Sequence, residues 1–106
     1  MIEPMSPERI WLMSIALHQR GQQRAARALK MLNAIIYSNA LPPEAHVASD
    51  IRLWHHGLGI VVHPDTTINQ GVQLAHQVTI GAGSPDTGTS FGVVIEDNVR
   101  IATGAV

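Results

Sequence analysis

Hydrophobic positions recur every six residues through the second part of the chain. A six-residue period matches neither the turn of an α-helix nor the alternation of a simple strand. It is typical of a parallel β-helix, in which three short strands and three turns complete a coil of about 18 residues. An ordinary sheet with alternating patches is the competing interpretation, but independent short strands have no reason to keep a common phase. The inward series are Val62, Ile68, Leu74 and Ile80; Ile60, Thr66, Val72 and Val78; Ile95 and Ile101 with Val99 and Ala105; and Val47 and Leu53 with Ala45 and Ile51.

The six-residue phase breaks at two places, between Leu53 and Val62 and between Ile80 and Ile95. The first interval is one and a half repeats long, and the second is two and a half repeats long. The first break predicts a bulge between its two residues, and the second predicts that the glycine-rich segment 81–92 leaves the coil as a loop. Insertions in repeat proteins often lie on the binding face, so both breaks are candidate sites. Residues that suit tight turns at the corners are Asn69, Gly71, Gly81, Asp97 and Asn98.

The N-terminal part follows a helical pattern instead. The segment Ser6-Pro7-Glu8 offers an N-cap, a proline for the first helical position and an acid for the first turn. Gly21 is expected to end this helix, and a second helix is expected from about Gln22. The Leu41-Pro42-Pro43 segment is expected to end the second helix, because proline cannot continue one.

We therefore expect two parts, a helical hairpin within residues 1–43 and a β-helix domain over 44–106. The repeat stops at Val106 within a coil. An open end of this kind is expected of a domain truncated at its C-terminus, or of one whose end is covered by another element.

The composition excludes several classes of function. The chain of 106 residues carries a net charge of −1 and 14% charged residues, so we expect no basic surface for nucleic acid. It has no cysteine, which excludes disulfides, thiolate catalysis and cysteine-based zinc sites. No signal peptide or membrane-spanning run is seen, so we expect a cytoplasmic protein without a membrane partner.

The segment LPPEAHVASDIRLWHHGLGIVVHPDTTINQGVQLAHQVTIGAG, residues 41–83, resembles the serine acetyltransferases among the hexapeptide-repeat acyltransferases. It is also similar to the related polysaccharide O-acetyltransferases. The shared features are a Leu-x-His followed by Gly-Ile-Val-Val, then His-Pro, a hexapeptide and Gln-Val-Thr-Ile-Gly before a glycine-rich loop. The closing IEDNVRIATGAV, residues 95–106, resembles the next coil of that family.

The resemblance implies a left-handed β-helix that assembles as a homotrimer, or as a dimer of trimers, with active sites between neighbouring subunits. It implies an acetyl-CoA-dependent O-acetyltransferase whose acceptor is a small molecule with a hydroxyl group. The first candidate acceptor is L-serine, in cysteine biosynthesis, and the second is a sugar or polysaccharide.

The resemblance also implies that a histidine of the Leu-x-His segment is the general base that activates the acceptor hydroxyl for direct attack on the thioester. A histidine suits this role because its ordinary pKa lies near neutral pH. Counting forward from the hexapeptide phase assigns the role to His55, whereas counting back from Gly59-Ile60-Val61-Val62 assigns it to His56. We prefer His55, since related sequences tolerate one more residue before the Gly-Ile-Val element. Both could instead be polar turn residues.

His76 stands in the same Leu-x-His setting as His55, further along the chain. One coil and the short bulge together account for the separation of the two histidines, so we expect their side chains on the same face. His76 would then orient the base, contact the thioester or only line a corner.

The resemblance implies that the pantetheine arm of the donor runs along the outside of the coil and binds main-chain groups. The matching positions are Gly81, Ala82, Gly83, Gly104 and Ala105. Glycine lets a ligand approach the backbone closely, although a flexible insert would also explain a glycine-rich loop.

Two departures from the family concern the acceptor. Trp54 stands where serine-specific members have an aspartate before the catalytic histidine, and Ser90-Phe91-Gly92 stands where they have an Arg-His pair. These departures put L-serine in doubt more than the transfer chemistry. Trp54 could line a pocket for a sugar ring or pack between subunits.

Two other classes of function compete with a transferase. One is a non-catalytic β-helix that serves as an assembly scaffold. The other is a metal-dependent hydratase, but adjacent histidines such as His55 and His56 should diverge in an extended strand, so no metal is expected. Of the other histidines, His63 is expected to be structural, and His18 and His46 are expected on the surface.

Overall fold

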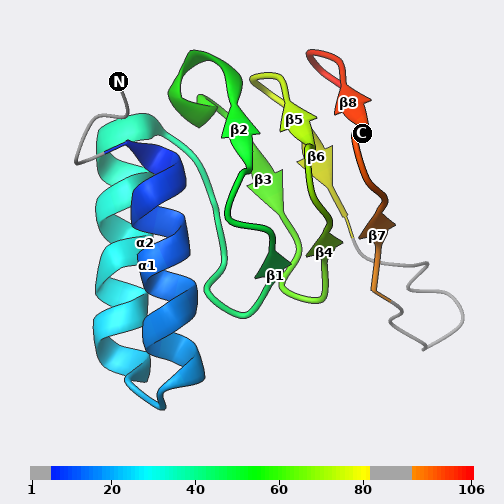
Figure 1. The fold of residues 1–106 in the computed structure, drawn as a ribbon. Coiled ribbons are helices and arrows are strands. Elements are labelled where there is room, and N and C mark those ends of the chain that lie inside the picture. The colour runs from blue at the N-terminus through cyan, green and yellow to red at the C-terminus, as the bar shows by residue number, and fades with distance from the viewer. Residues whose placement is uncertain (1–5, 82–91) are drawn as a thin grey trace, which may run out of the picture.

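The computed structural model describes residues 6–81 and 92–106. Its first elements are the helices α1 (Pro7–Gln19) and α2 (Gln23–Tyr37), which lie side by side as a hairpin (Figure 1). The Ser6 hydroxyl accepts a hydrogen bond from the Arg9 N–H (3.2 Å), so the predicted N-cap and first helix are confirmed. The prediction that the prolines end the second helix was wrong. α2 ends at Tyr37 because Ser38 adopts a left-handed conformation (φ 56°) that closes the last turn.

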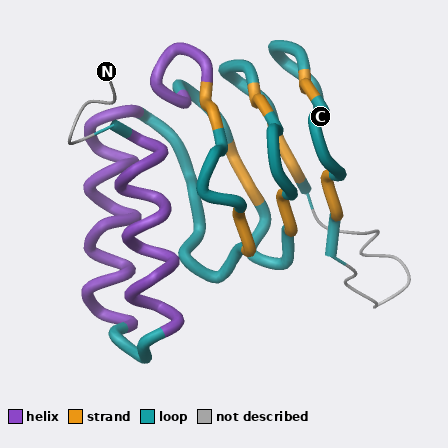
Figure 2. The backbone as a smooth tube through the Cα atoms, in the orientation of Figure 1, coloured by secondary structure: helices purple, strands orange, loops and turns teal. Residues whose placement is uncertain are grey.

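Eight strands of two residues each follow the hairpin (Figures 1 and 2). They form three parallel sheets in the orders β1-β4-β7, β2-β5-β8 and β3-β6, each with one strand per coil. This arrangement confirms the predicted parallel β-helix behind a helical hairpin. The strands are β1 (His46–Val47), β2 (Arg52–Leu53), β3 (Val61–Val62), β4 (Thr67–Ile68), β5 (Gln73–Leu74), β6 (Thr79–Ile80), β7 (Val94–Ile95) and β8 (Arg100–Ile101).

The register of the sheets accounts for both breaks in the six-residue phase. Val61 pairs with Thr79, its equivalent after three uninterrupted hexapeptides, so this coil has no insertion. Arg52 pairs with Gln73 across a longer coil, because the extra residues of the first break lie between β2 and β3. Gln73 pairs with Arg100 across the longest coil, because the second break lies between these two strands.

The inward positions form one continuous core. Ile60, Thr66, Val72 and Leu74 are fully buried, and Ile51, Leu53, Ile68 and Ile80 are nearly so. In the last coil Val99 is exposed (36%), since no further coil of the described chain stacks on it. The inward placement predicted for the hexapeptide series is therefore confirmed except at this residue.

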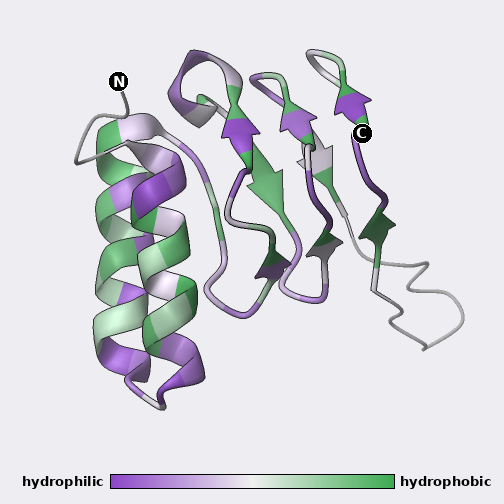
Figure 3. Ribbon diagram, viewed as in Figure 1, coloured by the Kyte–Doolittle hydropathy of each residue, from purple (hydrophilic) through white to green (hydrophobic). Residues whose placement is uncertain are grey.

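The hairpin covers the first coil, at the end of the stack opposite β7 and β8 (Figure 1). Trp11 of α1 is completely buried against the coil, and its indole N–H donates to the carbonyl oxygen of Pro42 (2.8 Å). Apolar and polar bands alternate around both helices in Figure 3, and part of the apolar surface of α2 is open to solvent at Met31 and Ile35. No helix within residues 6–81 and 92–106 is long and apolar enough to cross a membrane.

Candidate active site

The bulge in the first coil is a tight turn over Trp54–Gly57, here called the histidine turn (η1). His55 (φ 53°), His56 (φ 58°) and Gly57 (φ 71°) are three consecutive left-handed residues. The expectation of an extended strand at the two histidines was therefore wrong. Left-handed backbone is disfavoured for residues with a Cβ, and such strain, where it occurs, is often found at functional sites.

Packing beneath the histidine turn holds it in this conformation. A Cβ on Gly57 would lie 3.3 Å from Leu53 Cδ1 and 3.4 Å from the Asn39 side-chain amide nitrogen. The Asn39 amide donates to Asn33 Oδ1 (3.1 Å), and the Asn33 amide donates to the carbonyl oxygen of Pro7 (3.0 Å). Both asparagines are buried, so these hydrogen bonds connect the start of α1, α2 and the segment after α2 in a water-poor setting directly beside the turn.

His55 contacts His76 from the next coil. The two ring centroids are 4.6 Å apart and the rings are nearly perpendicular (84°). The separation of one coil and the bulge correctly predicts this proximity. His76 Nδ1 is buried and makes no hydrogen bond within the described chain.

His56 points to a different neighbour. Its ring stacks on Tyr37 at the end of α2, with centroids 5.5 Å apart and an interplanar angle of 27°. The two adjacent histidines thus have separate surroundings, one facing the next coil and the other facing the hairpin.

Both histidines line a cleft of about 850 Å³ between the first turn of α1 and strand β2. This space, here called the histidine cleft, is bounded on the helix side by Glu8 and Arg9 and on the coil side by Asp50 and Arg52. Its full lining is Ser6, Glu8, Arg9, Leu12, Ser49, Asp50, Ile51, Arg52, Leu53, His55 and His56.

Trp54 does not line the histidine cleft. Its side chain is half-exposed, and its indole N–H donates to Gln73 Oε1 (3.0 Å) on the outer face of the neighbouring strand. The hypothesis that Trp54 lines a sugar pocket therefore gains no support from this cleft.

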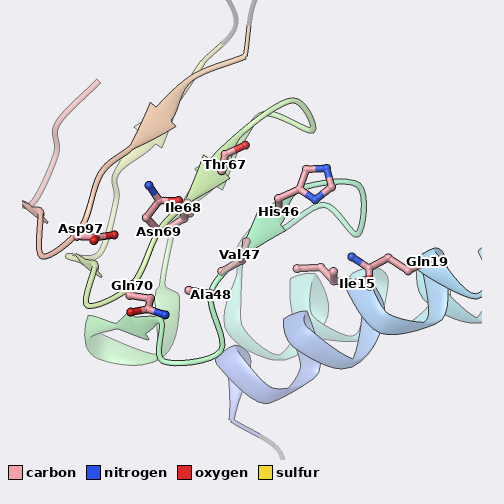
Figure 4. A pocket seen from close by; sticks show the side chains of 10 residues that line it. All are labelled: Ile15, Gln19, His46, Val47, Ala48, Thr67, Ile68, Asn69, Gln70 and Asp97. Atoms are coloured by element: carbon pink, nitrogen blue, oxygen red, sulfur yellow. The ribbon is translucent and has the colours of Figure 1, made fainter.

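A second concavity of about 530 Å³ lies along the C-terminal half of α1, and none of His55, His56 and His76 lines it. Figure 4 shows this space, here called the polar groove, with Gln19 and His46 toward the helix and Asp97 at the opposite end. His46 is exposed there, as predicted for a surface histidine.

The candidate donor positions fall into two groups. Gly81 directly follows β6 and is exposed, whereas Ala82 and Gly83 lie outside the described residues. Gly104 is left-handed (φ 77°), and the carbonyl oxygen of Ala105 accepts a hydrogen bond from Thr79 N–H (2.8 Å). Strand β6 and the 104–105 segment are therefore neighbours on adjacent coils.

Sequence reasoning missed the hairpin's contribution to the site. Glu8, Arg9 and Tyr37 meet the histidine turn across long sequence separations, and nothing in the six-residue period or the helical spacing points to these contacts. His63 Nδ1 accepts from Asp65 N–H (3.1 Å), in keeping with its predicted structural role. Within the described ranges, no three His, Asp or Glu side chains gather as a group that could hold a metal ion.

Several curated proteins are similar to this chain. It is 30% identical over 89 residues to the putative serine acetyltransferase of Schizosaccharomyces pombe, a match that covers 84% of this chain and 32% of that protein. It is 34% identical over 70 residues to the serine acetyltransferase of Buchnera aphidicola subsp. Schizaphis graminum, covering 66% and 26% respectively. The serine acetyltransferase of Staphylococcus aureus strain N315 is 30% identical over 98 residues, covering 91% and 45%.

The fold is similar to that in the crystal structure of serine acetyltransferase from Brucella abortus strain S19. The TM-score is 0.74 at 21% identity, over 94% of this chain and 47% of that one. No protein-family model matches the sequence. The chain spans less than half the length of the relatives it matches.

A helical hairpin that covers a stack of hexapeptide coils defines a protein of the parallel β-helix class. Within that class the chain is similar to serine acetyltransferases in sequence over most of its own length, and its fold is similar to that of a solved serine acetyltransferase.

Proposed function

We propose that this chain carries an acetyl-CoA-dependent O-acetyltransferase site in which His55 is the general base. The observation that carries the proposal is the position of His55. It lines the histidine cleft, and its ring lies against His76 in a strained turn. The similarity to serine acetyltransferases supports acetyl-CoA as donor and L-serine as the first acceptor to test.

The reaction is a direct transfer. A ring nitrogen of neutral His55 takes the proton of the acceptor hydroxyl while its oxygen attacks the thioester carbonyl carbon. The C–S bond breaks, and the leaving sulfur receives a proton from the imidazolium. The products are the acetyl ester and free CoA thiol, and the histidine returns to its neutral form.

His55 is preferred over His56 because of their neighbours. His55 lies against His76, whose Nδ1 is buried and has no hydrogen-bond partner within the described chain. The ring of His56 is stacked on Tyr37 instead. We assign His76 to the orientation of the base or of the thioester.

The donor is proposed to lie along the outside of the coils, where glycine permits close approach to the backbone. Gly81, which follows β6, is exposed there, and Ala105 is hydrogen-bonded to Thr79 at the start of the same strand. A trimer is proposed for the whole protein, and the exposed apolar residues Val61 (44%) and Val94 (60%) on outer faces of the coils suit a contact between subunits.

The test is acetyl-CoA-dependent release of free thiol, with mass spectrometry of the acceptor. L-serine and a panel of sugars are the acceptors, and His55→Ala is compared with His56→Ala. We expect acceptor-dependent release that falls by about a hundredfold or more in His55→Ala. Equal activity of both variants would contradict the assignment of the base, and absence of release from folded trimer would favour a scaffold.

A further inference from the structure

One hydrogen bond joins the two segments that carry the arginines of the histidine cleft. The N–H of Leu53 donates to Glu8 Oε2 (3.1 Å), which attaches the first turn of α1 to strand β2. Arg9 follows Glu8 on the helix, and Arg52 precedes Leu53 on the strand. Both arginines consequently line the cleft that also contains His55.

The carboxylates of the cleft form no ion pair with these arginines within the described residues. Glu8 accepts from the Leu53 backbone, and Asp50 Oδ2 accepts from the N–H of Gly71 (2.9 Å). Neither arginine side chain has a hydrogen bond or ion pair within residues 6–81 and 92–106. Two exposed arginines from distant parts of the sequence thus border one space without a hydrogen-bond or ion-pair partner in the described chain.

A guanidinium group presents planar, paired N–H donors that match a carboxylate. We propose that Arg9 and Arg52 form a subsite for a carboxylate of the acceptor, which rests on the function proposed above. The acceptor class is then a hydroxyl compound with a carboxylate, either a hydroxy amino acid or a sugar acid. A carboxylate held by these arginines places the hydroxyl in the cleft that His55 also lines and restricts its orientation.

The subsite also accounts for a departure in the sequence. The Arg-His pair that serine-specific relatives carry near the end of the glycine-rich loop is replaced by Ser90-Phe91-Gly92. Arg9 and Arg52 would supply the cationic group from the hairpin and the first coil instead.

Binding without acetyl-CoA tests the subsite directly. Calorimetric titration of the full chain would use two matched pairs of ligands, L-serine with L-serinamide and D-glucuronate with D-glucose. Each pair differs chiefly in the carboxylate. The variants are Arg9→Gln, Arg52→Gln and their lysine counterparts. The control is Arg100→Gln. Arg100 lies two strands from Arg52 in the same sheet, with Gln73 between them in register, and it does not line the cleft.

We expect at least one carboxylate ligand to bind about tenfold or more tightly than its neutral partner, a preference reduced about tenfold by each glutamine substitution. The lysine variants should retain part of the preference, because they keep the charge without the paired geometry, and Arg100→Gln should retain all of it. Thermal unfolding of each variant establishes that it is folded.

Binding of neither carboxylate by the wild-type chain overturns the proposal, as does an equal loss for the charged and neutral ligands. The two proposals fail separately. Carboxylate binding that needs both arginines, without thiol release from acetyl-CoA, supports the subsite and contradicts the transferase. Thiol release that is equally efficient with serinamide and serine supports the transferase and overturns the subsite.

Discussion

The two concavities at the junction of α1 and the β-helix differ in chemistry although one helix borders both. The histidine cleft lies at the first turn of α1, where Glu8 and Arg9 face the coil. The polar groove lies at the last turns of α1, where Ile15 and Gln19 face the coil. Trp11, between them, is completely buried and hydrogen-bonded to Pro42. The helix is therefore fixed to the coil near the middle and leaves a space toward each end.

The segment of the β-helix that faces α1 across each space explains the difference in chemistry. The polar groove is bounded by Thr67, Asn69 and Gln70 from a stretch that keeps the six-residue phase without interruption. The histidine cleft is bounded by the turn that interrupts the phase, where strained backbone presents two adjacent histidines. Regular repeats thus supply the support, and the insertion supplies the groups that can do chemistry.

Removing the residue between the two spaces should have the largest effect on stability. Trp11→Ala is expected to lower the free energy of unfolding by about 3 to 5 kcal/mol, because it removes a buried aromatic side chain. It also leaves the Pro42 carbonyl without its donor. Urea unfolding measures the change. Trp11→Phe, which keeps most of the apolar volume, should lose less, and equal losses in both variants would contradict this account of the contact.

Detaching only the first turn of α1 should have a smaller effect that is confined to the histidine cleft. Glu8→Ala is expected to cost about 1 to 2 kcal/mol of unfolding free energy, since the Leu53 N–H loses its acceptor. Glu8→Gln keeps an acceptor oxygen and should retain most of the stability. Amide hydrogen exchange at Leu53 should accelerate in the alanine variant, and unchanged protection there would show that the hydrogen bond does not hold α1 in place.

Changes in the polar groove should have the smallest effect. Asp97→Asn alters the charge of an exposed residue without a hydrogen bond or ion pair within the described ranges. It should change stability by less than about 0.5 kcal/mol and leave acceptor-dependent thiol release unaltered. A loss of release on the order of a hundredfold would mean that the reaction takes place in the groove.

The parts of the fold that repeat could be predicted from the sequence. Leu53, Leu74 and Ile101 occupy equivalent places in successive coils, so each position repeats the same requirement for an inward apolar side chain. Phase breaks are visible for the same reason. The proximity of His55 and His76 follows from counting residues around one coil, and the structure confirms it.

The parts of the site that depend on the hairpin could not be predicted. Helical spacing identifies α1 but does not say where it will lie on the coil. That position depends on single contacts, such as the indole of Trp11 with the Pro42 carbonyl and the Glu8 carboxylate with Leu53. The left-handed backbone of His55 and His56 runs against local preference, so tertiary packing rather than sequence pattern decides it.

The central claim is that acetyl transfer takes place in the histidine cleft and not in the polar groove. The most direct test is acceptor-dependent thiol release from acetyl-CoA by His55→Ala and His46→Ala, since each substitution removes an imidazole that lines one of the two spaces. The account predicts a loss of about a hundredfold or more for His55→Ala and wild-type rates for His46→Ala. The opposite result, with release lost in His46→Ala and retained in His55→Ala, would contradict it.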